Sequence, residues 1–341
     1  MKRRVSIILA IATLQCLMAV GAAAQSAPGC FRITFNIWFF PDAIPDGWNC
    51  NLPGEGPFSM FCAAVVNLCP PVYWCPTCQQ PGGTAASKPI NLVNGNTYIQ
   101  QKDVGIPGLG GGLNLQRTWN SIWPASEPTS ATGMFGPNWR STYEERISAG
   151  SGSASGYQVY SRSDGGLWYF GGTGSTLTLA SPANAVATLT SGASYWTLTF
   201  QNGEQRRFDN TSGSLIAIID RNGNTTQLAY DGSNRLVTIA DPASRHLTFT
   251  YGTGTTANLV VGVSSDVSLA LSYSYDTQGR LIQVTKPDLT TVNFTYNAQS
   301  LITSVTDTSG KVLEAHTYDS AGRGLTGSLA NGVEAVTVTY H

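Results

Sequence analysis

The sequence predicts an all-β protein, a ribbon or open shell of stacked β-hairpins behind a small disulfide-rich module. The first observation is a repeat: from residue 208 onward an aromatic residue recurs at steps of 22, 21, 24, 21, 22 and 22 residues. The second is the alternation of apolar and polar residues before most of these aromatics. The third is that only 11% of the residues are charged, which favours turn-rich β structure over charged helices. A fixed period of this length indicates one supersecondary unit that is copied and stacked.

Each repeat is predicted to be a hairpin that begins with an aromatic residue and a tight turn. Asp suits the first position of such a turn, and Gly or Asn supplies the positive φ near its end. A strand such as 291–296 then alternates with period two, which is typical of a half-buried strand. The predicted structural positions are Phe208, Asp209, Gly213, Tyr230, Asp231, Asn234, Arg235, Tyr275, Asp276, Gly279, Arg280, Tyr296, Tyr318, Asp319, Gly322 and Arg323.

The recurring Asp and Arg residues each have two interpretations. The Asp could be catalytic, but one residue type at one turn position in many copies is typical of an Asx hydrogen bond within the turn. The Arg could bind an acidic ligand, or it could lie across a neighbouring strand and pair with a turn Asp. For both residue types the repetition favours the structural role.

The first 24 residues are predicted to be a secretory signal peptide. Positive residues 2–4 precede an apolar stretch, 5–20, and the small residues 22–24 offer a cleavage site. A membrane anchor and a lipoprotein are the alternatives, although the stretch is short for a membrane span. We therefore expect a secreted, periplasmic or cell-surface protein with no membrane span after removal of the signal.

Six cysteines remain after the signal, all within 49 residues. An even number in an exported chain predicts three disulfides of undetermined pairing. Zinc binding by the last four cysteines and a redox pair at Cys75-Pro-Thr-Cys78 are the alternatives. The disulfide candidates are Cys30, Cys50, Cys62, Cys69, Cys75 and Cys78.

Four motifs between residues 88 and 143 carry a family resemblance. They are Lys88-Pro-Ile-Asn-Leu-Val-Asn-Gly-Asn96, Asp103-Val-Gly-Ile-Pro107, Arg117-Thr-Trp-Asn-Ser121 and Phe135-Gly-Pro-Asn-Trp-Arg-Ser-Thr-Tyr143. In this order they resemble the module that precedes the repeats in bacterial Rhs proteins, and the units from residue 208 onward resemble Rhs/YD repeats. The resemblance implies a β-ribbon wound into a non-enzymatic shell around a C-terminal toxin, with a self-cleaving motif at its far end. The chain has about six such repeats, which are expected to be too few to close a large shell, and we expect neither a toxin domain nor that motif after them.

The predicted domains follow from these patterns. They are a signal peptide (1–24), a Cys-rich disulfide module (25–80), a linker (81–87), an Rhs-type pre-repeat module (88–156), strands that lead into the repeats (157–207) and YD-type repeats (208–341).

The sequence offers no support for an enzyme, a cofactor or a metal site. The three histidines, His246, His316 and His341, lack metal-ligand spacing and are expected to be surface strand residues. A net charge of −1 gives no electrostatic case for binding nucleic acid or acidic membranes.

The leading hypothesis is an exported, non-enzymatic β-repeat scaffold with a surface-associated binding or encapsulation role in contact-dependent toxin systems. The alternatives are a truncated relic of an Rhs toxin-delivery protein that lacks its effector, and a secreted glycan-binding protein that uses exposed Tyr and Trp. The final predicted strand, 335–340, has no following repeat to cover its edge. We therefore expect it to pair with another protein chain.

Overall fold

The computed structural model describes residues 31–39, 49–53, 60–68, 85–86, 90–123, 132–182 and 185–340. The predicted signal peptide lies outside these ranges. The chain divides into two compact units, Met1–Val72 and Tyr73–His341, and each is described by itself. Within the described ranges, the regular structure consists of strands and short 3-10 turns, and no helix there has the length and apolarity that a membrane crossing requires. The all-β prediction is confirmed.

The first unit contains one three-stranded antiparallel sheet in the order β1-β3-β2. Its strands are β1 (Phe31–Phe39), β2 (Asn49–Pro53) and β3 (Met60–Leu68). The register places the backbone of Cys50 directly opposite that of Cys62. The other four disulfide candidates, Cys30, Cys69, Cys75 and Cys78, lie outside the described residues. The disulfides therefore remain a prediction of undetermined pairing.

The second unit is dominated by one antiparallel sheet, which we call the ribbon. Its 19 strands are hydrogen-bonded in sequence order, so each strand pairs with the next along the chain. The strands ahead of the repeats are β11 (Arg146–Ala149), β12 (Gln158–Ser161), β13 (Leu167–Gly171), β14 (Thr176–Ser181), β15 (Ala187–Ser191) and β16 (Tyr195–Phe200). The strands of the repeats are β17 (Gln205–Asp209), β18 (Leu215–Ile219), β19 (Thr225–Tyr230), β20 (Leu236–Ala240), β21 (His246–Tyr251), β22 (Val260–Ser265), β23 (Leu269–Tyr275), β24 (Leu281–Thr285), β25 (Thr291–Tyr296), β26 (Ile302–Asp307), β27 (Val312–Tyr318), β28 (Gly324–Leu329) and β29 (Val333–Thr337).

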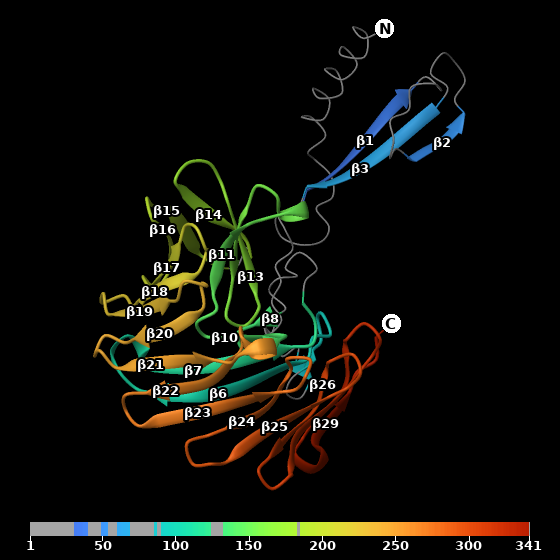
Figure 1. Cartoon of the computed structure of the whole chain (residues 1–341). Helices are drawn as coiled ribbons and strands as arrows, with labels where there is room; N and C mark the ends of the chain where they lie inside the picture. The colour runs from blue at the N-terminus through green and yellow to red at the C-terminus, as the bar shows by residue number, and fades with distance from the viewer. Residues whose placement is uncertain are drawn as a thin grey trace. The chain divides into compact units, whose positions relative to one another are not determined.

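A β-bulge precedes the aromatic residue of successive repeats. The strand register shifts immediately before Phe208, Tyr230, Tyr251, Tyr275, Tyr296 and Tyr318. A bulge bends its strand and increases the local twist, so bulges at the same position in each repeat bend the sheet repeatedly in the same sense. Figure 1 shows the resulting curvature of the ribbon from β11 to β29.

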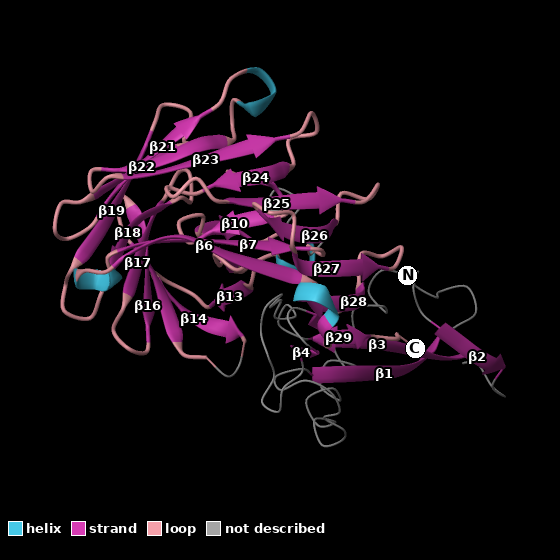
Figure 2. Cartoon of the chain, turned by 90° about the horizontal axis from the view of Figure 1, so that it is seen from below, coloured by secondary structure: helices cyan, strands magenta, loops and turns pink. Residues whose placement is uncertain are grey.

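A smaller set of strands lies inside the curve of the ribbon, and we call residues 90–123 and 132–145 the inner module. Its main sheet has the order β10-β7-β6. Figures 1 and 2 show these three strands in the middle, with the ribbon running around them. The strands are β5 (Ile90–Asn91), which pairs with β4 (Ala85–Ala86), β6 (Tyr98–Ile106), β7 (Leu113–Asn120), β8 (Thr132–Gly133), β9 (Gly136–Pro137) and β10 (Trp139–Ser141). The single 3-10 turns of the unit are η2 (Leu109–Gly111), η4 (Gly152–Ala154), η5 (Gly254–Thr256) and η6 (Ala330–Gly332).

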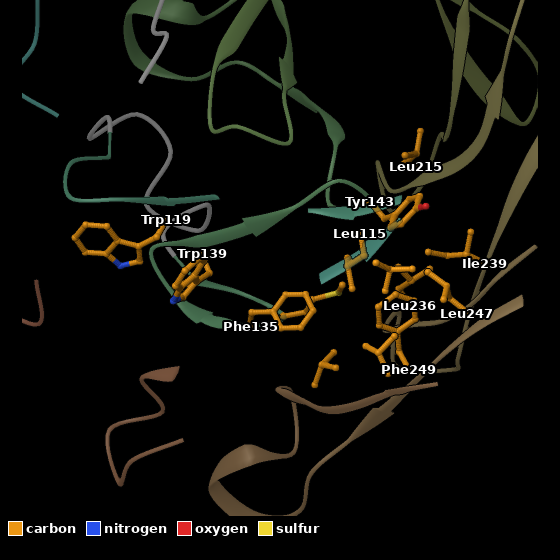
Figure 3. Packing of buried hydrophobic residues seen from close by; sticks show 14 of the residues in the cluster. Leu115, Trp119, Phe135, Trp139, Tyr143, Leu215, Leu236, Ile239, Leu247 and Phe249 are labelled. Carbon is orange, nitrogen blue, oxygen red and sulfur yellow. The ribbon is translucent and has the colours of Figure 1, made fainter. Parts of the chain in front are cut away.

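The apolar side chains of the inner module and of the ribbon's inner face form one core. Trp119, Phe135 and Trp139 are fully buried although each is large. Figure 3 shows the inner-module side chains facing apolar residues of the first repeats, which include Leu236 and Phe249. Burial of a large apolar side chain contributes roughly 2–3 kcal/mol. The inner face of the ribbon is therefore filled by the inner module and is not left hollow here.

One histidine expectation is wrong. His316 on β27 is 3% exposed, whereas it was expected at the surface. It stands two residues before Tyr318, and side chains two apart in a strand share a face. In other repeats Phe249 and Phe294 occupy this inward position. His246 lies at the surface as expected, with 45% of its side chain exposed, and His341 lies outside the described residues.

Candidate functional site: the repeat turns and the inner-module interface

The repeat turns are tied by their Asp side chains. Asp276 Oδ1 accepts hydrogen bonds from the backbone N–H groups of Gln278 and Arg280, both at 2.9 Å, and Arg280 Nε donates to Asp276 Oδ2 at 2.6 Å. Asp231 and Asp319 hold their turns in the same way. Partial burial opposes ionisation of Asp276, but the bonds from Arg280 outweigh it, so the pKa of this carboxyl lies below its usual value. These aspartates are occupied by the turn itself.

The arginine of one repeat covers the tyrosine of the next. The distance from the guanidinium carbon to the ring centre is 4.7 Å for Arg235 over Tyr251 and 4.9 Å for Arg280 over Tyr296. A third pair repeats this contact at 4.2 Å, Arg323 over Tyr340. Such cation–π contacts contribute about 0.5–2 kcal/mol each. Arg235, Arg280 and Arg323 therefore join successive repeats as well as closing their own turns.

The repeat tyrosines are also fixed by their hydroxyl groups. Each hydroxyl donates to the carbonyl at the start of the preceding unit at 2.6–3.0 Å: Tyr230 to Leu215, Tyr251 to Leu236, Tyr275 to Val260, Tyr296 to Leu281, Tyr318 to Ile302 and Tyr340 to Gly324. Phe208, which lacks a hydroxyl, is fully buried. The repeat tyrosines are half-buried and hydrogen-bonded, so they do not form the exposed stacking surface that the glycan hypothesis assigned to Tyr.

Three repeats lack the covering arginine. Asp209 N donates to Ser214 O just as Asp231 N donates to Arg235 O, both at 2.9 Å, so Ser214 is the structural equivalent of Arg235. Leu259 and Leu301 take this place in two later repeats. The ring that follows Leu301 is covered instead by the inner module, because Trp119 lies edge-on to Tyr318 at 6.4 Å.

Two turn glycines with positive φ, Gly279 and Gly322, lie where the inner module approaches the ribbon. Gly279 has φ +73°, and a Cβ added at Gly136 of the inner module would lie 2.6 Å from its carbonyl oxygen. Gly322 has φ +80°, and a Cβ there would lie 3.3 Å from Ser121 O. Direct backbone contacts between the inner module and the ribbon are Val260 N to Met134 O at 2.8 Å and Gly324 N to Gly95 O at 2.9 Å. The small turn residues therefore allow the two parts to pack backbone against backbone.

A buried ion pair lies between the inner module and the middle repeats. Arg117 and Asp103 expose 1% and 3% of their side chains, and Arg117 Nη2 donates to Asp103 Oδ1 at 2.9 Å. The hydroxyl of Tyr273 on β23 donates to Asp103 Oδ2 at 2.8 Å. Burial alone would lower the pKa of Arg117, but the Asp103 carboxylate outweighs it, and the pKa is raised. Loss of one partner of such a pair is strongly destabilising.

Aromatic rings enclose the same guanidinium group. The Arg117 guanidinium carbon lies 4.7–5.5 Å from the ring centres of Phe135, Trp139 and Tyr273. Arg117 and Asp103 belong to two sequence motifs that are 14 residues apart, and Phe135 and Trp139 belong to a third. Three of the four resemblance motifs therefore meet at one point in the fold.

A second buried polar network joins the first motif to the third. Asn96 Nδ2 donates to Asn120 Oδ1 at 2.9 Å, and Thr97 N donates to Ser121 Oγ at 2.9 Å. Asn96 and Asn120 are fully buried. Satisfied buried networks specify one arrangement of the backbone, which explains why polar residues stand in this core.

A cavity of about 420 Å³ opens where the inner module meets the first repeats. Its lining includes Tyr143, Glu144, Arg146, Ser214 and Tyr230. Glu144 is committed to the fold, because its carboxylate accepts from Met134 N at 2.6 Å and from Ser141 N at 2.7 Å. Burial, and then the Glu144 carboxylate, raise the pKa of the Tyr230 hydroxyl.

The charges around this cavity are mostly paired. Glu145 is buried and lies 3.2 Å from Arg206 Nε; burial raises its pKa even though Arg206 acts in the opposite direction. Arg235 pairs with Asp231 at 2.7 Å. The Arg146 guanidinium differs, because its buried Nε has no hydrogen-bond partner among the described residues. The cavity therefore combines a cation that is unpaired within these residues with carboxylate and tyrosine neighbours.

Within the ranges that the structure describes, no group of three His, Cys, Asp or Glu residues has the arrangement of a metal site. The sequence identified the turn aspartates and arginines but missed Ser214, Arg146 and the pair of Asp103 and Arg117. The sequence did contain a signal for Ser214, because a small residue stands there at the position that holds Arg in other repeats. Nothing in the local sequence indicated Arg146, because its neighbours come from distant segments.

This geometry defines a class of protein, a scaffold of stacked β-hairpins wound around an inner module. Its recurring polar residues hold the repeats together. Two family models match the chain. Residues 210–252 and 275–312 match the RHS repeat, and residues 87–178 match a domain of unknown function, DUF6531, a range that contains the whole inner module. These two matches support the resemblance of the chain to the Rhs/YD-repeat family.

Curated relatives and solved structures show more distant similarity. The chain is 28% identical over 147 residues to the tRNA nuclease WapA of Bacillus subtilis (strain 168), which covers 43% of this chain and 6% of that protein. The structure of TcdB2-TccC3-Cdc42 aligns with a TM-score of 0.31 and 11% identity, over 68% of this chain and 14% of that one. The Photorhabdus luminescens Tc holotoxin pore aligns with a TM-score of 0.29 and 11% identity, over the same shares. The chain thus spans only a small fraction of each relative. TM-scores this low support no conclusion about function.

Proposed function

We propose that this protein is an exported, non-enzymatic Rhs-type scaffold that presents a rigid curved β-ribbon as a binding or encapsulating surface in a toxin-related system. The single observation that carries the proposal is the common core that the inner module and the ribbon form. The inner module packs against successive repeats through Arg117, Asp103 and the aromatic residues around them. The recurring charged side chains are used within the turns, which supports a structural role over a catalytic one.

Incubation of the purified chain with transfer RNA tests the non-enzymatic part of the proposal, because the relative WapA is named a tRNA nuclease. We expect intact RNA on a denaturing gel after prolonged incubation with and without divalent cations. The variant Asp276→Asn serves as a control for any activity that co-purifies. Cleavage that requires the protein and disappears in a variant of one of its own residues would overturn the proposal.

Export is tested separately. Fusion of residues 1–24 to alkaline phosphatase, which is active only outside the reducing cytoplasm, is expected to give active enzyme. Replacement of Lys2, Arg3 and Arg4 by Glu is expected to abolish it, because the positive n-region is needed for export. Equal activity from a fusion without residues 1–24 would contradict the proposed export.

The outer edge of β29 is a proposed partner surface. Among the described strands, β29 is hydrogen-bonded to β28 alone, and a free strand edge is a template for pairing with another chain. We expect light scattering on the purified protein to show a dimer or larger species as the concentration rises. A monomer throughout the accessible concentration range would refute pairing through this edge.

A further inference from the structure

The cavity between the inner module and the first repeats is a candidate ligand site because its shape follows from the first of the three repeats that lack the covering arginine. In three later contacts an arginine covers the ring of the following tyrosine: Arg235, Arg280 and Arg323. Ser214 occupies the equivalent position ahead of Tyr230. The serine side chain is much shorter than that of an arginine and has no guanidinium group, so the space beside Tyr230 stays open. Ser214 and Tyr230 both line the resulting cavity of about 420 Å³.

The backbone explains how this opening is held. Arg146 at the start of β11 forms an isolated antiparallel bridge with Ser214, and Ile147 N donates to Gly213 O at 2.9 Å. A Cβ at Gly213 would collide with Ile147 O. The first repeat turn is therefore clamped against β11, and the Arg146 side chain is brought to the cavity by main-chain contacts. A wall fixed in this way is preformed, as ligand sites commonly are.

The charges around the cavity favour an anion beside one residue, Arg146. Glu145 has Arg206 and Arg235 has Asp231 as ionic partners. No ion pair or hydrogen bond of the Arg146 guanidinium occurs among the described residues, and its Nε is buried. A guanidinium matches a carboxylate through two parallel N–H···O bonds. Arg146 is thus the group best suited to hold a carboxylate in this cavity.

The remaining lining favours a polar ring over an apolar one. Glu144 and Glu145, whose carboxylates are already bonded within the fold, are part of the lining, and Asn258 brings a side-chain amide with no hydrogen bond among the described residues. Tyr230 contributes an aromatic ring at the place where later repeats stack a flat cation. A pyranose ring has an apolar face for stacking and hydroxyl groups at its rim, and a uronate adds one carboxylate.

We propose that this cavity binds an acidic monosaccharide unit, a uronate, with its carboxylate on Arg146 and its ring beside Tyr230. The site lies at the junction of β11, the inner module and the first repeat. It differs from the exposed Tyr and Trp surface that the sequence suggested for glycans. It is independent of the scaffold proposal, because a scaffold without this ligand would have the same ribbon.

Isothermal titration calorimetry on the full mature chain tests the proposal with glucuronate and galacturonate as probes. Glucose and acetate serve as matched probes that lack the carboxylate and the ring, respectively. We expect saturable binding of at least one uronate and at least tenfold weaker binding of glucose and of acetate. Absence of saturable uronate binding, or equal affinity for glucose, would overturn the proposal.

Two variants locate the binding. Arg146→Gln is expected to weaken uronate binding at least tenfold, whereas Arg221→Gln, at an exposed turn arginine away from the cavity, is expected to leave it unchanged. Ser214→Arg restores the covering residue of the later repeats and is expected to fill the cavity and abolish binding. Because the restored contact with Tyr230 is one that the fold already uses, this variant is expected to melt at the same or a higher temperature. A well-folded Ser214→Arg protein that binds uronate as the wild type does would refute the assignment.

Discussion

At the residue scale, the repeat depends on groups that serve two turns at once. The Asp of a turn accepts hydrogen bonds from its own backbone and from its own Arg, and that Arg then covers the Tyr of the next repeat. The Asx turn and the pairing of Asp with Arg were foreseeable from the spacing within one repeat. The stacking of Arg on Tyr was not, because it depends on the register between neighbouring strands.

Tyrosine at the repeat position is expected to contribute stability through its hydroxyl. Tyr296→Phe keeps the ring under Arg280 but removes the hydrogen bond to Leu281 O at 2.7 Å. We expect a loss of about 1 kcal/mol in the free energy of unfolding, the usual net value of a buried hydrogen bond, measured by urea denaturation. Tyr195→Phe is the matched control, since Tyr195 lies under Arg207 and its hydroxyl has no hydrogen bond among the described residues. Equal losses in both variants would contradict this account of the repeat tyrosine.

At the element scale, the recurring bulge and the short turns decide how the strands are assembled. Alternation identified β21, β23 and β25 closely, because each buries every second residue. The final strand was predicted at 335–340 but is β29, Val333–Thr337. The bulges before each aromatic were not foreseen, because the residues around them keep the alternating pattern. The inward position of His316 was missed for a different reason. Its residue type suggested a surface position, but its place in the alternating pattern puts its side chain on the buried face of the strand.

The contact of β11 with the first repeat turn is testable with two glycines. Gly213 and Gly223 have φ values of +70° and +86°, so alanine is strained at both. A Cβ at Gly213 meets Ile147 O, whereas a Cβ at Gly223 meets nothing within 4 Å. We expect Gly223→Ala to cost about 1 kcal/mol and Gly213→Ala to cost clearly more, by urea denaturation. Similar costs would show that β11 does not pack against this turn.

At the scale of the whole molecule, sequence periodicity predicted the ribbon but not what fills it. The motifs of residues 88–143 were recognised as a module, yet their contact with the repeats depends on partners such as Tyr273, which is 170 residues from Asp103. Apolar strand faces show that a partner is required, and only the fold shows which segment provides it. The ribbon and the inner module therefore form one structural unit, with Arg117 near its centre.

Stability is expected to fall on both sides of neutral pH. Hydrogen bonds lower the pKa of the turn aspartates in the folded protein, as at Asp209. The stability that these aspartates contribute is therefore complete above their unfolded pKa of ~4, and it is lost as the pH falls through the lower folded values. Burial raises the pKa of repeat tyrosines such as Tyr275, so their contribution is complete below an unfolded pKa of ~10 and is lost as the pH rises. The urea midpoint is expected to be flat between about pH 5 and pH 9 and to decline beyond both limits. In Asp276→Asn the decline on the acid side should be smaller; a midpoint independent of pH below 4 would contradict the role of the turn aspartates.

The packing of the inner module against the repeats is tested most directly by a double-mutant cycle between Trp139 and Phe294. Their rings lie edge-on with centres 5.3 Å apart, one in the inner module and the other on β25. From urea denaturation of Trp139→Leu, Phe294→Leu and the double variant, we expect a coupling energy of about 0.5–1.5 kcal/mol. The same cycle with Trp168→Leu in place of Trp139→Leu is expected to be additive. Additivity of Trp139→Leu with Phe294→Leu would contradict a ribbon wound around the inner module.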